Sequence, residues 1–112
     1  MKIKLDFDKE QQIVIPLEGG GKSSVYAKLI KFDCITDFNF TIHDYEFPER
    51  NFVVSELSTG MQIVSASSSA MVKSLAKQKL EKNKGEFGSI MANAVRLIKK
   101  QGFRFPLNEI EE

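Results

Sequence analysis

The hydrophobic pattern of the chain changes its period once, near Ala66, and this change restricts the fold more than any other feature. Before Ala66, apolar residues alternate with polar ones, which is typical of strands with one buried face. After it, apolar residues recur at helical spacing, as in amphipathic helices. A run of strands followed by a run of helices predicts an α+β fold. We expect a mainly antiparallel sheet of about five or six strands from the N-terminal half, with two C-terminal helices packed on one face.

Two hairpins are predicted in the first part of the chain. Residues 3–7 and 13–17 each alternate between apolar and polar side chains, on either side of a short polar stretch. Residues 52–66 alternate again around Ser58-Thr59-Gly60. Gly60 would supply the positive φ that the last position of such a hairpin loop needs. We therefore expect a hairpin at each of these places.

The other strand assignments concern the middle and the end of the chain. Residues 38–43 place apolar side chains on one face and polar ones, including His43, on a face that we expect to be solvated. Residues 23–32 fit a strand or a helix, and we assign them to a strand because the flanking segments are strands. Residues 103–107 are expected to form a short edge strand, since Pro106 cannot donate to a ladder.

Two amphipathic helices are predicted after Ala66. Ser67-Ser68-Ser69 can cap the first helix by accepting hydrogen bonds from its free N–H groups. Lys79 falls within the apolar arc of this helix, so either its stem snorkels along the core or the helix frays there. Gly85 separates the two helices, and Gly102 is well placed to end the second. The apolar stripe of the second helix, with Arg96 and Lys100 opposite, contains Phe87, Ile90, Met91, Ala94, Val95 and Ile98.

The stretch PLEGGGKSSV contains Gly21-Lys22-Ser23, which matches the last residues of the phosphate-loop pattern G-x-x-x-x-G-K-[ST]. The first glycine of that pattern would fall on Pro16, which has no N–H and a fixed φ. The glycines of this stretch instead predict a connection between two strands, because they allow a tight turn. Nucleotide binding through residues 19–23 is therefore kept only as an alternative, and Lys22 could contact an anionic partner.

Few residues could support catalysis or metal binding. His43 is the only histidine and Cys34 the only cysteine, which excludes a multi-histidine metal site and an intramolecular disulfide. Their odd spacing would place them on opposite faces of one strand, as a solvated histidine and a small buried thiol. Glu56 lacks the nearby lysine of a metal-dependent nuclease site. We therefore predict no enzymatic activity, no cofactor and no metal, despite the acidic residues Asp33, Asp37, Asp44, Glu46 and Glu49.

Charge is segregated along the chain. Residues 1–60 carry seven Lys or Arg and ten Asp or Glu, a net charge of −3, whereas residues 61–112 carry nine and five, a net charge of +4. Lys73, Lys77 and Lys84 would fall within about 40° on a helical wheel if the first helix continued that far. This basic ridge could bind nucleic-acid phosphates or be a solvated face. Its possible extensions are Arg96, Lys99, Lys100 and Arg104.

Length and composition indicate an ordinary globular protein. The chain has 112 residues, which suits a single domain covering residues 1–112. Its 42% hydrophobic and 28% charged residues are typical of globular chains. No apolar run reaches the roughly 18 residues that span a bilayer, and the N-terminus has no apolar signal core. With its single cysteine, the chain is expected to be cytoplasmic and without membrane contact.

Three functional hypotheses from different classes follow. We favour a small non-enzymatic interaction protein that binds a host protein or ribonucleoprotein, because no catalytic set assembles and the two halves differ in the sign of their charge. The alternatives are nucleic-acid binding through the basic ridge and nucleotide-dependent catalysis through Lys22. The hairpin VSELSTGMQIVSAS feeding a lysine-rich helix is similar to short open reading frames of phages and mobile elements. This similarity implies an inhibitor of a bacterial defence nuclease, of the anti-CRISPR type.

Overall fold

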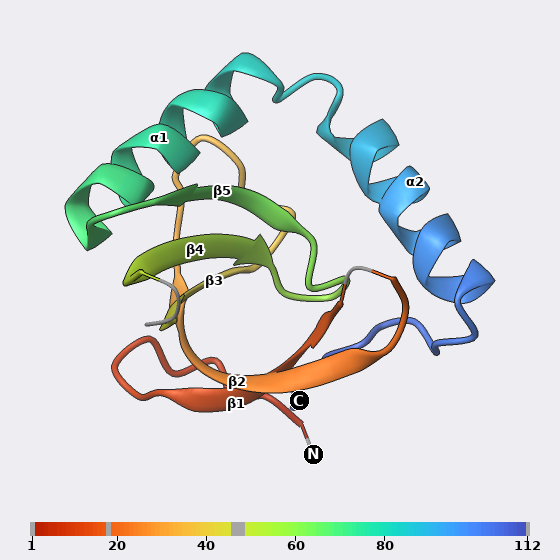
Figure 1. The fold of residues 1–112 in the computed structure, drawn as a ribbon. Coiled ribbons are helices and arrows are strands. Elements are labelled where there is room, and N and C mark those ends of the chain that lie inside the picture. Colours follow the sequence, from red (N-terminus) through yellow and green to blue (C-terminus); the bar gives the residue numbers. More distant parts are fainter. Residues whose placement is uncertain (1, 18, 46–48, 112) are drawn as a thin grey trace.

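Among residues 2–17, 19–45 and 49–111, which the computed structural model describes, the chain forms five strands followed by two helices. The strands pair in the order β1-β2-β3-β4-β5, each antiparallel to the next. Both helices pack on one face of the sheet, which confirms the predicted α+β fold (Figure 1). The elements are β1 (Gln11–Pro16), β2 (Lys22–Ile30), β3 (Phe40–Tyr45), β4 (Asn51–Glu56), β5 (Gln62–Ala66), α1 (Ser69–Lys82) and α2 (Phe87–Lys100).

The first hairpin differs from the prediction in its partner strand. β1 pairs with β2, and not with residues 3–7, of which Ile3 makes only an isolated bridge to Ile110. The prediction was wrong because alternation shows which face of a strand is buried, but not which strand pairs with it. The three glycines at 19–21 have φ values from 80° to 99° and form the turn between β1 and β2. The strand assignment of residues 23–32 and the connecting role of these glycines are thus confirmed.

The second hairpin is formed by β4 and β5, as predicted. Gly60 has a φ of 68° in the turn between them. A Cβ at this position would lie 2.7 Å from Pro16 Cδ and 3.1 Å from Val14 O. Glycine is therefore needed here both for the backbone conformation and for the close approach of β1. The curvature of the sheet brings the end of β1 against the β4–β5 turn (Figure 1).

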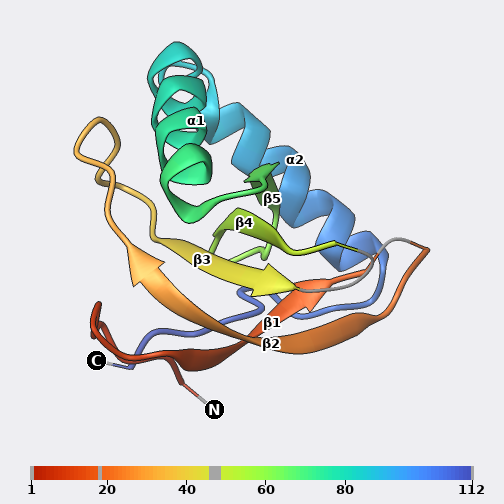
Figure 2. The same ribbon diagram turned by 60° about the vertical axis from the view of Figure 1, so that its left-hand side comes forward.

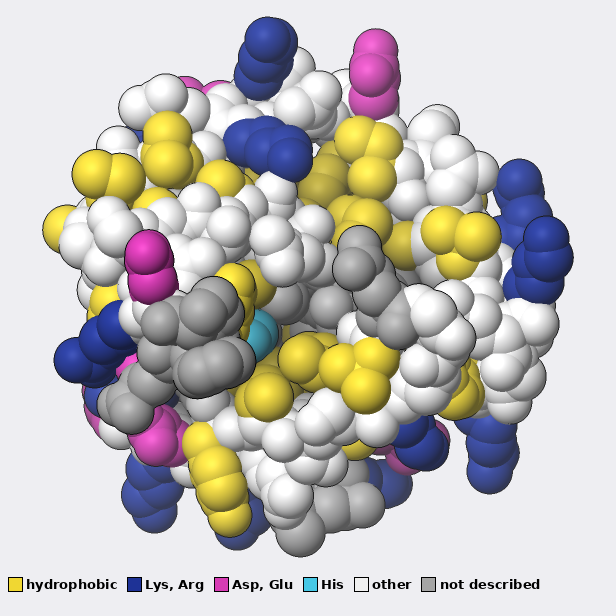
Figure 3. Space-filling model, in the orientation of Figure 1, with side chains coloured by type: hydrophobic (Ala, Val, Ile, Leu, Met, Phe, Trp, Pro, Cys, Tyr) yellow, Lys and Arg dark blue, Asp and Glu magenta, His cyan; other side chains and the backbone are white. Residues whose placement is uncertain are grey.

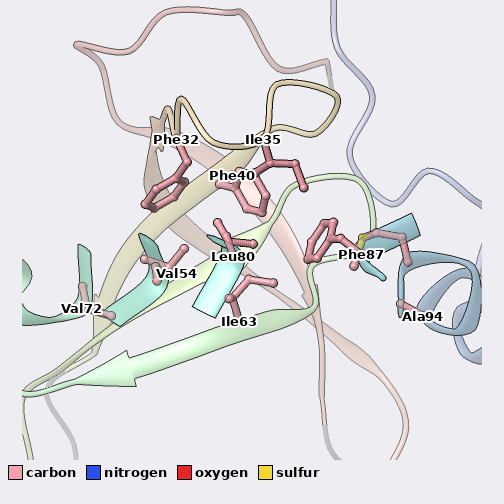
Figure 4. Close-up of a cluster of buried hydrophobic side chains, with 11 residues drawn as sticks. Phe32, Ile35, Phe40, Val54, Ile63, Val72, Leu80, Phe87 and Ala94 are labelled. Carbon is pink, nitrogen blue, oxygen red and sulfur yellow. The ribbon is translucent and has the colours of Figure 1, made fainter. Parts of the chain in front are cut away.

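The larger hydrophobic core lies between the sheet and the helices (Figure 4). Its aromatic side chains pack edge to face: the ring centroids of Phe38 and Phe87 are 4.8 Å apart, and those of Phe32 and Phe40 are 5.4 Å apart. This core ties together segments that are far apart in the sequence, because each amphipathic element buries its apolar stripe here. Its buried members are Phe32, Ile35, Phe40, Val54, Ile63, Val72, Ala76, Leu80, Phe87, Met91 and Ala94.

A smaller core lies on the opposite face of the sheet, where the two ends of the chain meet (Figure 2). The Ile3 N–H donates to Glu109 O, and the Glu111 N–H donates to Ile3 O. Residues 103–107, predicted as an edge strand, form no strand; they lead instead to Asn108, which is buried. The buried apolar residues of this core are Ile3, Ile13, Ala27, Leu29 and Leu57.

Asn108 supplies the free edge of β1 with a hydrogen-bonding partner. Its Oδ1 accepts from the Val14 N–H at 2.7 Å, and its Nδ2 donates to Val14 O at 2.8 Å and to Leu57 O at 2.7 Å. One side-chain amide thereby replaces a neighbouring strand at Val14 and joins β1 to the end of β4. This contact satisfies backbone groups that would otherwise be buried without partners.

The α1 helix begins as its sequence predicts. The Ser68 side chain accepts a hydrogen bond from the Met71 N–H at 3.1 Å, so the serines act as an ordinary cap. Lys79 is exposed, but it lies at the edge of the apolar side of α1, and its Nζ donates to Ile63 O on β5 at 2.7 Å. The first of the two alternatives for Lys79 is therefore correct, because the stem covers apolar surface and α1 continues to Lys82.

Candidate functional site

The basic side chains predicted to form one ridge lie on several separate parts of the fold. Lys73 and Lys77 lie on α1, but this helix ends at Lys82, so Lys84 is outside it. The condition for a continuous ridge is not met, because Asn83 ends α1 with its N–H on Lys79 O. All of the predicted basic residues are solvent-exposed, and the others lie on α2 or after it: Arg96, Lys99, Lys100 and Arg104.

Lys22 and Arg104 come together although they are far apart in the sequence. They line a hollow of about 430 Å³, here named the basic hollow, together with Lys2, Gly102, Phe103, Pro106, Leu107 and Glu109. The Lys22 Nζ lies 5.8 Å from the centroid of the Phe103 ring, which holds the ammonium group over this side of the hollow. Among the described residues of its lining, three cations and one carboxylate give the hollow a positive charge.

The geometry around Lys22 is not that of a phosphate loop. Lys22 is the first residue of β2, and the residues after it continue as a strand up to Ile30. A phosphate loop needs a helix at this point, because the N–H groups of its first turn bind the anion. This geometry gives no support to the alternative of nucleotide binding through residues 19–23. Lys22 instead contributes to a surface shared with the C-terminal segment.

An apolar groove of about 450 Å³ runs beside α2, on the side of the helix next to the core. Leu97 lies in its wall with 61% of its surface exposed, although Ile98 next to it is buried. None of the described residues that line the groove is charged. They come from α2, from the end of β1 and from the β4–β5 turn: Pro16, Leu17, Thr59, Met61, Ile90, Asn93, Ala94, Leu97, Ile98 and Gln101.

The groove exists because the apolar surface of α2 is wider than the surface that the sheet covers. Phe87, Met91 and Ile98 form the buried stripe, whereas Ile90 and Leu97 lie beside it. These two are seven residues apart and share one side of the helix. The sequence prediction included Ile90 in the stripe but missed Leu97. Leu97 could have been found from its spacing of seven residues from Ile90, because this spacing places both side chains on the same side of the helix.

The α2 groove and the basic hollow lie next to each other. Pro16 in the groove is paired across β1 and β2 with Lys22 in the hollow. Gln101 in the groove precedes Gly102 in the hollow. In Figure 3, hydrophobic side chains gather between α2 and the sheet, while Lys and Arg side chains project at the edge of the molecule. The result is an uncharged groove with cations at the end where α2 finishes.

His43 is buried, and the prediction that it would be solvated was wrong. It is 7% exposed and Thr41 is 1% exposed, because both lie on the inner face of the curved sheet. Within the part of the chain that the structure describes, Thr41 Oγ1 and His43 Nδ1 have no hydrogen-bond partner. Burial lowers the pKa of His43 from its ordinary value of 6.5, and the nearby Asp44 carboxylate opposes this effect. Cys34 is half-buried and packs against the core on the helix side, so it is not paired with His43.

The acidic residues that the structure describes do not assemble into a metal site. Glu56 is buried, and its carboxylate accepts hydrogen bonds from the N–H and hydroxyl groups of Ser58 and Thr59, at 2.7 to 2.9 Å. This carboxylate therefore holds the β4–β5 turn. Among the described residues, no group of three or more His, Cys, Asp or Glu side chains could hold a metal ion. Asp33, Asp37, Asp44 and Glu49 are exposed, and Glu46 lies outside the described residues.

Comparison with known proteins adds no family to this description. A scan against protein-family models, a search of curated proteins and a search of solved structures each found no match. In the described parts of the chain, neither helix combines the length and the apolar character needed to cross a membrane.

Proposed function

We propose that the protein is a non-enzymatic interaction protein that binds another protein through the α2 groove. The observation that carries this proposal is a groove of about 450 Å³, uncharged in its described lining, beside a helix that exposes 61% of Leu97. Burial of this apolar surface by a partner would contribute favourable free energy to binding. Such a role suits an adaptor, a subunit or an inhibitor, which needs surface complementarity and no catalytic group.

Protein binding is favoured over nucleic-acid binding because of what lines this surface. Nucleic-acid sites combine cations along a continuous path with aromatic side chains on which bases stack. The cations on α1 and α2 do not form one ridge with Lys84, and the α2 groove is lined by aliphatic and amide side chains. The interface cores of protein complexes, in contrast, are apolar and contain few charged residues.

The proposal is tested by a substitution within the groove. Leu97→Asp places a charge in the groove wall, and because Leu97 is exposed the fold should be retained, as circular dichroism would verify. The immobilised protein and this variant are incubated with a lysate of the cells in which the protein is made, and bound proteins are identified by mass spectrometry. We expect a partner that the unmodified protein retains and the variant loses, and that forms a defined complex in gel filtration once purified.

The matched control is Lys99→Glu, which changes charge on the opposite side of the same helix. At about 100° per residue, Lys99 lies about 160° from Leu97 on the helical wheel. We expect this variant to retain the same partner. If Leu97→Asp and the unmodified protein retained identical sets of proteins, binding through the groove would be wrong.

A further inference from the structure

The α2 groove has the length and lining of a site for a short amphipathic helix. The segment of α2 from Ile90 to Lys100 rises by about 15 Å, which accommodates about three turns of a second helix. The groove offers such a helix uncharged walls from Leu97, Met61 and Leu17. Apolar side chains at spacings of about three, four and seven residues would therefore face the groove, as in other helix-in-groove complexes.

The charge beside one end of this groove indicates the chemistry of the partner. The basic hollow, with Lys2, Lys22 and Arg104 against Glu109, adjoins the end at the C-terminus of α2. Lys100 lies about 60° from Leu97 on the helical wheel, so it flanks the same end. Cations next to an apolar groove favour carboxylates on the partner and disfavour lysines, because like charges brought together are repelled.

We infer that the partner contributes an amphipathic helix with acidic residues clustered at one end, which lies in the α2 groove with those residues over the basic hollow. This inference rests on the proposed function and specifies the partner at the same site. The apolar side of the helix fills the groove, and its carboxylates pair with Lys22 and Arg104. The apolar contacts supply most of the affinity, while the carboxylates set the direction of binding and increase the association rate.

The inference is tested with synthetic peptides of defined charge. The first probe is a fluorescein-labelled helix of about four turns, with leucines at helical spacing and three glutamates at one end. The second has glutamines in place of the glutamates, and the third has lysines. Binding to the full chain is measured by fluorescence anisotropy at low and high salt. We expect the acidic peptide to bind about tenfold more tightly than the glutamine peptide at low salt, and this difference to shrink at high salt.

Two variants of the protein separate the contributions of the groove and the hollow. Leu97→Asp should weaken the binding of the acidic and glutamine peptides alike. Lys22→Glu combined with Arg104→Glu should remove the advantage of the acidic peptide and leave the glutamine peptide nearly unchanged. Lys99→Glu makes the same change of charge away from the groove. This variant should still bind the acidic peptide more tightly than the glutamine peptide.

The outcomes distinguish this inference from the proposed function. If the acidic and lysine peptides bound equally, and Leu97→Asp weakened both, the groove would bind a partner but the acidic helix would be wrong. Failure of every peptide to bind would also overturn the inference that the partner contributes an acidic helix. The proposed function would then still depend on the lysate experiment, which makes no assumption about the partner's sequence or secondary structure.

Discussion

At the scale of single residues, the fold depends on polar side chains that take the place of missing backbone partners. Asn108 is the clearest case, since its amide bonds to both backbone groups of Val14 and to Leu57 O. Its position late in the chain gives no hint of this role, because the residues it contacts are distant in the sequence. Only the folded arrangement brings the C-terminal segment beside β1.

Asn108→Ala should lower the free energy of unfolding by about 2–3 kcal/mol, because it leaves the part-buried backbone groups of Val14 and the buried Leu57 O without partners. Urea unfolding followed by circular dichroism measures this loss. Glu109→Ala is the control, since the Glu109 side chain is exposed and only its backbone takes part in the pairing with Ile3. Equal midpoints for the two variants would contradict the role assigned to Asn108.

His43 gives the molecule a pH dependence of stability. Because burial lowers its pKa, the unfolded chain binds a proton more readily than the folded chain. The contribution of neutral His43 to the free energy of unfolding is therefore fully present above the ordinary pKa of 6.5. It is lost as the pH decreases from there towards the lowered pKa.

We expect the urea midpoint of the unmodified protein to decrease between about pH 7.5 and about pH 5.5, and that of His43→Gln to change much less. The comparison is clean because His43 is the only histidine in the chain. The measurement is a series of urea unfolding curves across this range. Parallel pH profiles for the two proteins would show that His43 does not cause the effect.

At the scale of secondary-structure elements, both edge strands of the sheet have a side chain bound to their backbone. Asn108 does this for β1, and Lys79 does it for β5 through its hydrogen bond to Ile63 O. An edge strand with free backbone groups can pair with a second copy, and lysine at an edge is a common protection against this. Lys79 therefore has a structural role that its charge alone does not suggest.

Lys79→Ala should increase self-association, because it frees Ile63 O and exposes apolar surface of β5. Sedimentation velocity at increasing protein concentrations measures the fraction of dimers and larger species. Lys77→Ala removes a lysine from the same helix that does not bind β5. The self-association of this variant should equal that of the unmodified protein. If both variants had the same concentration dependence as the unmodified protein, the protective role of Lys79 would be refuted.

At the scale of the whole molecule, the change of hydrophobic period predicted the α+β class, the second hairpin and both helices. These features are set by local patterns, which a sequence displays directly. The pairing of β1 with β2 and the path of residues 103–107 were not predicted, because they depend on contacts between distant segments. Of the candidate site, Lys22 and Arg104 were identified singly as binding residues, and Ile90 only as part of the apolar stripe of the second helix. Only the tertiary structure shows that these residues lie around a groove and that Leu97 forms part of its wall.

The meeting of the two chain ends has a consequence for how the protein is made. Residues near the N-terminus leave the ribosome first, yet Ile3 and Val14 are paired with Ile110 and Asn108. The smaller core therefore cannot close until residues up to Ile110 have left the ribosome. Strands β3 to β5 and α1, whose contacts are nearer in sequence, can assemble earlier. Closure of the smaller core is thus expected to be a late step in the folding of residues 1–112.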